Sequence, residues 1–462
     1  MSRNKANLTT ALSPARRAAL RILLSVQAGR GYAVDLLQGS ALKSLREADR
    51  RLATELVMGV LRWRGDLDFQ VATLSGKALA CFDPEIVEAL RLGVYQIRFL
   101  CAIPKAAAVS QAVEMAKWSR KTSAAGLVNA VLRKCDRAPF NGLSAAERDA
   151  SPEYLESAQR STPGWIRERW KRRYGPDTAH AVVLGSQMIP RACLRVSGNE
   201  AERERLRLEL AQAGIVAHPG VYSRKALVVD SGGLHDLRAW REGGLTLQDE
   251  ASQLAAVLVD PRPGERVLDV CAAPGVKTGQ LAETLREGTL VACDRSMRRM
   301  RRMATVSSIG SRAAPEGVRL HRVLLDAQQS LPFRPPFDRV LVDAPCSGTG
   351  TLARNPEIKW RLKPEDLPRL SEIQGGILDR ACEMLGASGR LIYATCSLEP
   401  EENEWVIARV LAGRPGFRAL TAAELRHEFP EMGQLFDPDG YFRTSPGAHH
   451  MDGFFAAVIV RD

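Results

Sequence analysis

Two cysteines in the second half of the chain lie where nucleophilic chemistry is expected. Cys346 belongs to a DAPC motif that directly follows the strand-like run DRVLV, and Cys396 follows the strand-like run RLIYAT. In an open α/β sheet, ligands bind beyond the carboxyl ends of the parallel strands, so both thiols would face the same ligand. A lone cysteine at a strand end is usually a small buried apolar residue. Two of them at adjacent strand ends favour a chemical role.

A pair of thiols suits a reaction at an aromatic carbon that is a poor nucleophile by itself. Enzymes that methylate amino groups carry an aromatic residue after the proline of this motif, where the chain has Cys346. A thiolate can instead add to C6 of a cytosine, which makes C5 nucleophilic enough to accept a methyl group, and the thiol leaves once the C5 proton is lost. Asp343 would hold the N3 and N4 edge of the base. The residues alone leave the roles of the two thiols exchangeable.

A loop of small residues, CAAPGVKT, follows an earlier strand-like run, RVLDV. Small residues allow a ligand to approach the backbone closely, and the helix start behind them favours a negative group such as a carboxylate. Val276 and Cys271 occupy the two places where a P-loop needs glycine, and a dinucleotide-binding fingerprint is incomplete. Both phosphate-binding interpretations are therefore weakened. Cys271 and Cys293 themselves are expected to be small buried side chains.

Acidic residues end the next two predicted strands. Asp294 follows TLVAC, where a carboxylate can accept both hydroxyls of a ribose, and Asp326 follows RLHRVLL, within reach of an adenine amino group. One acid at a strand end is usually a turn or helix cap, but two beside a small-residue loop indicate a nucleoside site. Lys277, at the end of the loop, either pairs with Asp343 or begins a helix in solvent.

The elements that must position these residues alternate between strands and helices. From about Pro263 onward, strand-like runs are separated by helical segments, which predicts an α/β fold with a parallel sheet and crossover helices. The runs are RVLDVC, TLVACD, RLHRVLLDA, DRVLVDAPC and RLIYATC, and the final GYFRTSP and GFFAAVIV are expected to form an antiparallel hairpin. This order fits a Rossmann-like methyltransferase domain better than a dehydrogenase.

The first 140 residues show the apolar spacing of a helical bundle, with helix starts expected at Ser13-Pro14, Asp49, Asp83-Pro84 and Ser123. The polar, proline-bounded stretch that follows is expected to be a linker with a short helix. After it, WIRERWKRRYG is expected to form a helix that buries its two tryptophans, with base stacking as the alternative. The predicted domains are a helical domain (1–140), the linker (141–163), a small α+β domain (164–245) and the Rossmann-like domain (246–462).

Charge is distributed unevenly along the chain, whose formal net charge is +12. Residues 1–140 hold 22 Lys and Arg against 11 Asp and Glu, and the rest of the chain holds 43 against 42. This excess suits a domain that contacts nucleic-acid phosphates, although it also suits a solvated surface. Charge alone does not separate RNA from DNA or an acidic membrane.

Other global features exclude several classes. There is no run of about 18 apolar residues and no apolar segment behind the charged start, so a cytoplasmic protein without a membrane span is expected. The nine cysteines are scattered without a C-x-x-C pair, which predicts reduced thiols and no zinc or other metal site. We also expect a monomer.

Several motifs resemble one family closely. The runs CAAPGVKT, LVDAPCSGTGTLARNPEIKW, YATCSLEPEENE, QDEASQ and DGFFAAVIVR are similar to those of the Nol/Nop/Sun (Sun-type) RNA cytosine-5 methyltransferases. The helical N-terminal domain resembles the transcription antitermination factor NusB, and this narrows the resemblance to the bacterial branch that acts on 16S ribosomal RNA. The resemblance spans essentially the whole chain.

The resemblance implies a reaction and a site. The reaction is methylation of C5 of a cytosine in 16S ribosomal RNA through a covalent Cys–C6 intermediate, with S-adenosylmethionine as methyl donor and an RNA-binding bundle. Cys396 would be the nucleophile and Cys346 the thiol that helps to release the product. Asp343 and Lys277 complete the catalytic set, and Pro345 lies near the target base. The residues implied to surround S-adenosylmethionine are Cys271, Ala272, Ala273, Pro274, Gly275, Val276, Lys277, Asp294, Asp326 and Asp343.

Two departures from the family pattern bear on the site. Val276 stands where the family commonly has a second glycine, and a β-branched residue would be strained there if the backbone needs a positive φ. ARNPEIKW is less basic than the family's version, which implies one arginine contact to RNA fewer. The alternatives are a related enzyme acting on transfer RNA and a non-catalytic RNA-binding assembly factor. The NusB-like bundle argues against the first alternative, and the intact thiols, acids and loop argue against the second.

Overall fold

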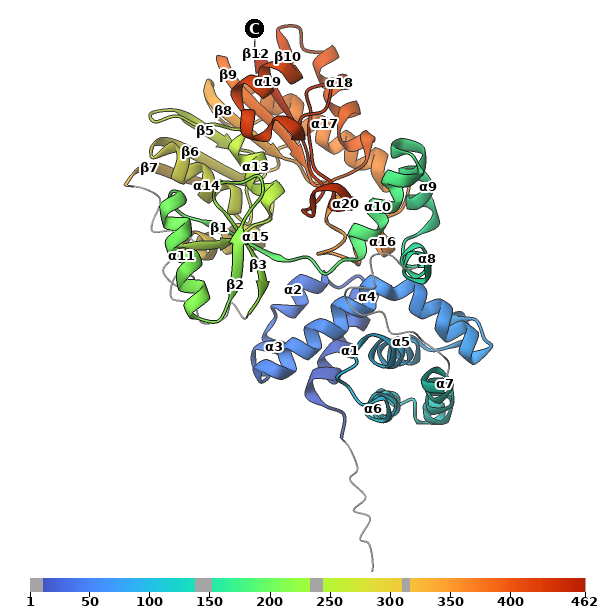
Figure 1. The fold of residues 1–462 in the computed structure, drawn as a ribbon. Helices are drawn as coiled ribbons and strands as arrows, with labels where there is room; N and C mark the ends of the chain where they lie inside the picture. Colours follow the sequence, from blue (N-terminus) through green and yellow to red (C-terminus); the bar gives the residue numbers. More distant parts are fainter. Residues whose placement is uncertain (1–10, 138–151, 233–243, 310–315, 462) are drawn as a thin grey trace, which may run out of the picture. The chain divides into compact units, whose positions relative to one another are not determined.

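The computed structural model describes residues 11–137, 152–232, 244–309 and 316–461, which form two compact units. One, here called the helical unit, comprises Met1–Met188 and Leu352–Arg361. The other, called the sheet unit, comprises Ile189–Thr351 and Leu362–Asp462. The chain therefore leaves the sheet unit after Thr351 and returns to it at Leu362. Figure 1 shows the elements of both units, and each is described by itself.

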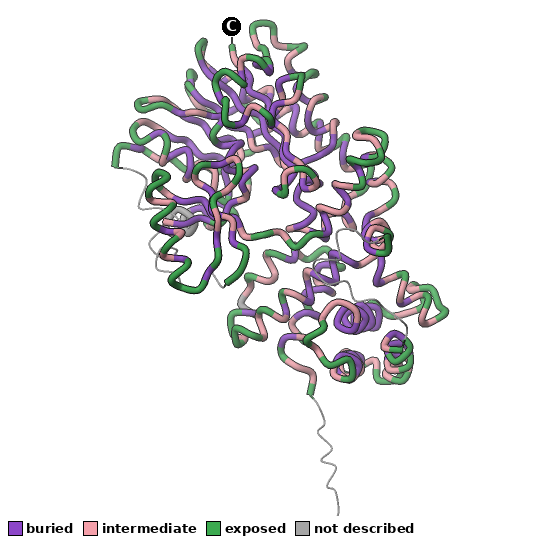
Figure 2. The backbone as a smooth tube through the Cα atoms, viewed as in Figure 1, coloured by how far each residue is buried: buried purple, intermediate pink, exposed green. Residues whose placement is uncertain are grey.

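The long helices of the helical unit share one core, within which α5 (Pro84–Phe99) is buried on all sides from Ile86 to Ile97. Ser13 and Asp83 directly precede α1 and α5, as predicted, and each of these helices has a proline in its first turn. Figure 2 shows the tube of α5 coloured as buried along most of its length. The helices are α1 (Pro14–Gln27), α2 (Ala33–Leu37), α3 (Ser40–Lys43), α4 (Glu47–Ser75), α5 (Pro84–Phe99), α6 (Lys105–Trp118), α7 (Ala125–Arg137), α8 (Pro152–Arg160), α9 (Gly164–Tyr174), α10 (Pro176–Gln187) and α16 (Ile358–Arg361).

Two sequence expectations for this unit can be checked directly. The short helix expected in the linker is α8, of which residues 152–160 are described. Helix α9 buries Trp170, which is 1% exposed, so its amphipathic interpretation is confirmed at that position. Trp165 is only half-buried. The prediction that both tryptophans are buried is therefore half correct, because α9 offers its core face to Ile166 and Trp170, four residues apart.

The sheet unit contains a small antiparallel sheet with strand order β2-β3-β1-β4. Strands β1 (Ala192–Val196) and β3 (Ala226–Ser231) and helix α11 (Glu200–Gln212) were expected from the sequence, and Asn199 caps α11 by accepting from the backbone N–H of Glu202 at 3.0 Å. Strands β2 (Val216–Pro219) and β4 (Leu245–Leu247) were not expected, because each is too short to show a clear alternation.

The large sheet has the strand order β10-β12-β9-β8-β5-β6-β7, and β11 pairs with β12 beside this path. Five consecutive strands of this order are parallel to one another, from β9 through β8, β5 and β6 to the edge strand β7. Strand β12 lies antiparallel to β9. The expected Rossmann-like sheet is thus confirmed. The strands are β5 (Arg266–Asp269), β6 (Glu287–Asp294), β7 (Gly317–Leu324), β8 (Phe337–Asp343), β9 (Leu385–Thr395), β10 (Phe417–Ala419), β11 (Phe442–Arg443) and β12 (Phe455–Arg461).

Helices cover the large sheet and bury its apolar side chains. In Figure 2 the strands of this sheet are largely buried, as expected for parallel strands with helices on both faces. The helices of this part are α13 (Glu250–Val257), α14 (Val276–Leu285), α15 (Met297–Ile309), α17 (Asp366–Met384), α18 (Glu404–Ala412), α19 (Ala422–Glu428) and α20 (Pro446–His449). Within the described ranges of the chain, no helix combines the length and apolar character that a membrane span requires.

Candidate active site

The two cysteines predicted to carry chemistry lie side by side. Strands β8 and β9 are parallel neighbours in which Asp343 is paired with Ala394, so the turns that follow them begin at the same edge of the sheet. The Sγ atoms of Cys346 and Cys396 are 3.4 Å apart, and both side chains are half-buried. Two thiols at this distance can act on one ligand atom or on two adjacent ones.

The environment of Cys346 favours its protonated form. Its pKa is raised well above the usual value by the hydrogen bond with Cys396, by burial, and by the negative charges of a Cys396 thiolate and Glu402. Cys346 therefore holds its proton at neutral pH. It can donate a hydrogen bond to the neighbouring sulfur.

Lys277 lies in the first turn of α14 and pairs with Asp343, with 2.8 Å between Nζ and Oδ2. Burial disfavours the charged form of Lys277, but the charge and hydrogen bond of Asp343, together with the Cys396 and Asp269 charges, outweigh it and raise its pKa. The ammonium also lies 5.0 Å from the centre of the Phe454 ring. Lys277 is thus a fixed positive charge beside Asp343, which settles the choice left open by the sequence.

The small-residue loop turns tightly before α14. Ala272 donates its N–H to the carbonyl of Cys293 at 2.7 Å, which fixes the loop against β6, and Gly275 donates to Ala272 at 2.8 Å. Gly275 has a φ of 101°, and a Cβ there would come within 2.7 Å of Met303. The left-handed position is therefore Gly275. Val276 begins the helix and is not among the residues with positive φ, so the strain considered for it does not arise.

Asp294 closes the other side of this loop. It is 3% exposed, and its carboxylate accepts from the backbone N–H of Ser296 at 2.7 Å and, more weakly, from that of Ala273 at 3.3 Å. Arg299 pairs with it at 3.1 Å. Asp326 differs: it is exposed, lies two residues beyond β7, and accepts from the N–H of Gln328 at 3.1 Å. The structure thus brings Asp294 to the loop, whereas the described contact of Asp326 is with the backbone of its own turn.

Asp269, the last residue of β5, belongs to the site although the sequence motifs did not predict a role for it. It is completely buried, accepts from the hydroxyl of Thr278 at 2.7 Å, and leaves its second oxygen without a partner among the described residues. Burial raises its pKa to about 7. Its place at the end of a strand, next to the small-residue loop, was the available signal.

Three acids surround the loop, of which Asp294 is paired with Arg299 at 3.1 Å and Asp343 with Lys277 at 2.8 Å. Burial raises the pKa of Cys271 well above its usual value, and the charges of Asp269, Asp343 and Asp294 raise it further, so three carboxylates act on this one loop. Cys271 is therefore a protonated thiol, and the buried Cys293, whose pKa is raised to about 12, is one as well. The acids, the close backbone at Gly275 and the free Asp269 oxygen fit a nucleoside that carries a sulfonium and an amino group.

Pro345 and Ala344 place the DAPC turn against its surroundings. The carbonyl of Pro345 accepts from the Nε2 atom of Gln374 at 2.9 Å, and Ala344 donates its N–H to the carbonyl of Ala394 at 2.8 Å. These bonds fix the turn on both sides before Cys346. Gln374 was not anticipated from the sequence, because its position on α17 is only brought to the turn by the tertiary fold.

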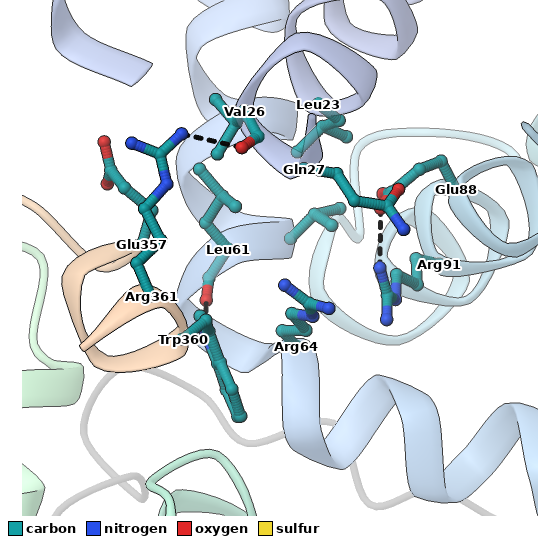
Figure 3. A pocket seen from close by; sticks show the side chains of 11 residues that line it. Leu23, Val26, Gln27, Leu61, Arg64, Glu88, Arg91, Glu357, Trp360 and Arg361 are labelled. Atoms are coloured by element: carbon teal, nitrogen blue, oxygen red, sulfur yellow. Dashed lines mark hydrogen bonds and ion pairs between the residues drawn. The ribbon is translucent and has the colours of Figure 1, made fainter. Parts of the chain in front are cut away.

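A separate pocket of about 150 Å³ lies within the helical unit. Figure 3 shows Trp360, whose Nε1 donates to the carbonyl of Leu61 at 2.9 Å, and the pair of Arg91 and Glu88 at 2.5 Å. None of the predicted site residues lines this pocket. Its lining consists of Leu23, Val26, Gln27, Val60, Leu61, Arg64, Glu88, Arg91, Glu357, Trp360 and Arg361.

Family models match three successive parts of the chain. A model described as 16S rRNA methyltransferase RsmB/F matches residues 256–460, and a NusB family model matches residues 13–137. Between them, a model of the ferredoxin-like domain of RsmF/B-like methyltransferases matches residues 162–234. The helical, α+β and Rossmann-like parts expected from the sequence therefore each have a counterpart in known proteins.

Relatives match nearly the whole length of the chain. A ribosomal RNA small subunit methyltransferase B of Pseudomonas putida is 34% identical over 455 residues, covering 96% of this chain and 98% of the relative. A protein of the same name in Vibrio cholerae is 32% identical over 434 residues, covering 93% of each chain. A solved structure titled PH0851 is 25% identical with a TM-score of 0.77 and covers 98% of this chain and 99% of its own. The chain therefore belongs to the 16S rRNA methyltransferase RsmB/F family and is an S-adenosylmethionine-dependent methyltransferase that acts on RNA.

Proposed function

We propose that this chain methylates C5 of a cytosine in 16S ribosomal RNA, with Cys396 as the nucleophile and Cys346 as the thiol that assists release. The observation that carries the proposal is the 3.4 Å separation of the two sulfurs at neighbouring strand ends. Methylation of an amino group or of a ribose hydroxyl needs no thiol, whereas C5 of cytosine needs a nucleophile at C6.

The steps follow from the residues around the thiols. The Cys396 thiolate adds to C6, the C5–C6 double bond opens, and its electron pair moves through C4 onto N3, which takes up a proton at the edge held by Asp343. Bound S-adenosylmethionine would supply the methyl group to C5, and the bond from that group to the sulfonium sulfur would break, leaving a neutral thioether. The C5 and N3 protons are then lost to solvent, the C5–C6 double bond re-forms, and Cys396 leaves as a thiolate.

Cys346 and Lys277 have supporting roles in this scheme. Because the pKa of Cys346 is raised, it stays a thiol and can donate a hydrogen bond to the Cys396 sulfur as that sulfur departs. Lys277 keeps Asp343 in place at 2.8 Å, and its ammonium interacts favourably with a Cys396 thiolate. We propose further that the methyl donor lies against residues 271–277 and Asp294, with the free oxygen of Asp269 as an additional contact.

The proposed partner is ribosomal RNA rather than transfer RNA. The relatives that match most of the chain are named as small subunit ribosomal RNA enzymes, and the part that matches the NusB family carries most of the excess positive charge. A basic helical domain would contact RNA phosphates and contribute a salt-dependent part of the affinity. A non-catalytic assembly factor would have no need for two adjacent thiols at the end of the sheet.

The experiment is methyl transfer from labelled S-adenosylmethionine to 16S ribosomal RNA with purified full-length variants. We expect Cys396→Ala to abolish transfer and Cys346→Ala to accumulate an RNA–protein adduct that resists denaturant. Cys101→Ala, which removes an exposed thiol of the helical unit, should leave transfer unchanged. An adduct with Cys396→Ala but not with Cys346→Ala would exchange the two roles. Full transfer by both variants would refute the cysteine mechanism.

A further inference from the structure

A buried carboxylate lies between the two cysteine turns. Glu402 ends the short helix η4 (Pro400–Glu402), and its side chain is completely buried. Its Oε1 accepts from the backbone N–H of Ser347 at 2.8 Å and from Nε2 of Gln374 at 2.9 Å. Its Oε2 accepts from the hydroxyls of Ser347 and Ser397, the latter at 2.5 Å. Four donors therefore satisfy one buried carboxylate, as burial of a charge requires.

Those donors are the residues next to the thiols. Ser347 directly follows Cys346, Ser397 directly follows Cys396, and their hydroxyl oxygens are 3.1 Å apart. Gln374 reaches the other side of the first turn by donating to the carbonyl of Pro345 at 2.9 Å. The carboxylate thus joins the two turns one residue away from each sulfur.

Glu402 is itself fixed to the strand that carries Cys396. Its backbone carbonyl accepts from the hydroxyl of Tyr393 at 2.5 Å. Its neighbour Asn403 accepts from the hydroxyl of Thr395 at 2.6 Å and donates to the carbonyl of Ser397 at 2.9 Å. Because Tyr393 and Thr395 belong to β9, the position of the carboxylate is defined by the sheet.

The thiols cannot supply this order themselves. An S–H group is a weak donor and sulfur a weak acceptor, so the contact between Cys346 and Cys396 contributes little to holding two turns together. Charge-assisted bonds from hydroxyl and amide donors to a carboxylate are about twice as strong as neutral ones. The cluster of Glu402, Ser347 and Ser397 is therefore a stronger link between the turns than the contact between the thiols, and it acts beside the bond from the N–H of Gly350 to the carbonyl of Cys396 at 2.9 Å.

We propose that Glu402 is the positioning residue that sets the separation of the two thiols, and thereby the rate at which the bond between Cys396 and C6 forms and breaks. This inference rests on the proposed function for its effect on catalysis, but its effect on the thiol separation stands without it. Glu402 does not touch the base or the methyl donor in this scheme. It acts through the turns.

The thiol separation can be measured without any RNA. Phenylarsine oxide reacts with two adjacent thiols, forming two As–S bonds and releasing one water, and it binds isolated thiols poorly. Wild-type protein should bind one equivalent across Cys346 and Cys396, located by mass spectrometry of the digested protein. Glu402→Ala should weaken this binding about ten-fold or more, because the turns lose their shared acceptor. Cys346→Ala sets the level expected without the pair.

The catalytic consequence is a fall in kcat without a matching change in binding. We expect Glu402→Ala to lower kcat about 100-fold, since a displacement near 1 Å can cost that much, with the KM for RNA and the affinity for S-adenosylmethionine unchanged. Glu402→Gln, which keeps the size and one acceptor, should lie between wild type and Glu402→Ala in both assays. Glu372→Gln, an exposed acid on α17 near Gln374, should match wild type.

The outcomes separate this inference from the proposed function. If Glu402→Ala does not fold, Glu402→Gln tests the proposal instead. Arsenical binding and kcat equal to wild type in Glu402→Gln would overturn the role of Glu402. If the wild type binds the arsenical in a Glu402-dependent way but transfers no methyl group to cytosine, the proposed reaction fails and the positioning role is retained. Loss of transfer in Glu402→Ala with intact arsenical binding would also overturn it.

Discussion

Two stretches that follow one another along the chain, 343–351 and Leu352–Arg361, are held by different means. The first belongs to the sheet unit, where the turn around Cys346 is bonded to the next strand end and to Glu402. The second belongs to the helical unit, where Glu357 accepts from the N–H of Ala33 at 2.6 Å and Trp360 donates to Leu61. One segment places the Cys346 sulfur beside that of Cys396, and the next anchors the chain in a bundle of helices.

The two stretches also bury charge with different success. The first stretch contributes donors to the buried carboxylate of Glu402, and each of the two carboxylate oxygens accepts two hydrogen bonds from residues of the site. Lys359 is 1% exposed and donates to the carbonyl of Arg62 at 3.0 Å and to Oε1 of Gln187 at 3.3 Å, while the positive charge of Arg62 disfavours its charged form and helps to lower its pKa. One atom each of Arg62 and Glu357, Nε and Oε2, lacks a partner among the described residues. The anchor therefore carries an electrostatic cost that Glu402 does not, and within the site the comparable cost falls on Asp269, whose second oxygen has no partner among the described residues.

The largest expected effect comes from breaking the first stretch at Gly350. Its N–H donates to the carbonyl of Cys396 at 2.9 Å, and a Cβ at this position would lie 2.0 Å from the carbonyl oxygen of Gly453. Backbone must move to admit it, and the Cys396 turn moves with it. We expect Gly350→Ala to lower kcat about 100-fold in the methyl-transfer assay.

The matched control for that variant is Gly376→Ala in α17. A Cβ there meets no atom within 4 Å, and alanine stabilises a helix interior by about 0.5–1 kcal/mol relative to glycine. Its kcat should equal that of wild type and its Tm should be slightly higher. Equal loss of activity in both variants would show that the sheet unit tolerates no added methyl group, and the special role of the Gly350 contact would be lost.

A smaller effect is expected from breaking the second stretch at Trp360. Trp360→Ala removes the hydrogen bond to Leu61 and the contact of the ring with Arg64, 5.4 Å from its centre. Because the side chain is half-buried, we expect about 2 kcal/mol less stability in the helical unit, measured by urea unfolding. Affinity for S-adenosylmethionine should be unchanged. Trp405→Ala, which removes an exposed ring of the sheet unit, should change neither quantity.

The sequence predicted the first stretch far better than the second. Parallel strands bring their carboxyl ends to one edge, so the adjacency of Cys346 and Cys396 followed from strand order and motif alone, whereas the pairing of Lys277 with Asp343 was one of two possibilities that the sequence left open. The strain considered at Val276 was misplaced by one residue, because the left-handed position is Gly275. The motif predicted the position of the small-residue loop, but it did not predict which residue of the loop has the positive φ.

The parts that escaped prediction depend on contacts between distant residues. Glu402 and Gln374 have no periodic signal, since their role comes from the donors that the fold brings to them. The sequence interpretation of ARNPEIKW concerned only an arginine contact to RNA that it lacks, and it did not predict that Glu357 and Lys359 are buried against residues about 300 positions earlier in the chain. A charged side chain in a sequence is ordinarily assigned to solvent or a polyanion, and only the tertiary structure shows that these two are interior.

The smallest expected effect concerns the pH dependence of the anchor. Burial, and secondarily the Arg62 charge, lower the pKa of Lys359 well below its usual value, so the unfolded chain binds more protons than the folded chain between the folded pKa and about 10.4. The free energy of unfolding must then rise with pH across this window. Lys359→Met removes the titrating group and should flatten that rise between about pH 7 and pH 9.

Urea unfolding followed by tryptophan fluorescence measures the free energy of unfolding of the helical unit, which contains five of the tryptophans: Trp63, Trp118, Trp165, Trp170 and Trp360. If the free energy of unfolding rises with pH equally in wild type and variant, Lys359 is charged in the folded bundle. The electrostatic difference between the two stretches would then be refuted, and only the difference in their hydrogen-bond partners would remain.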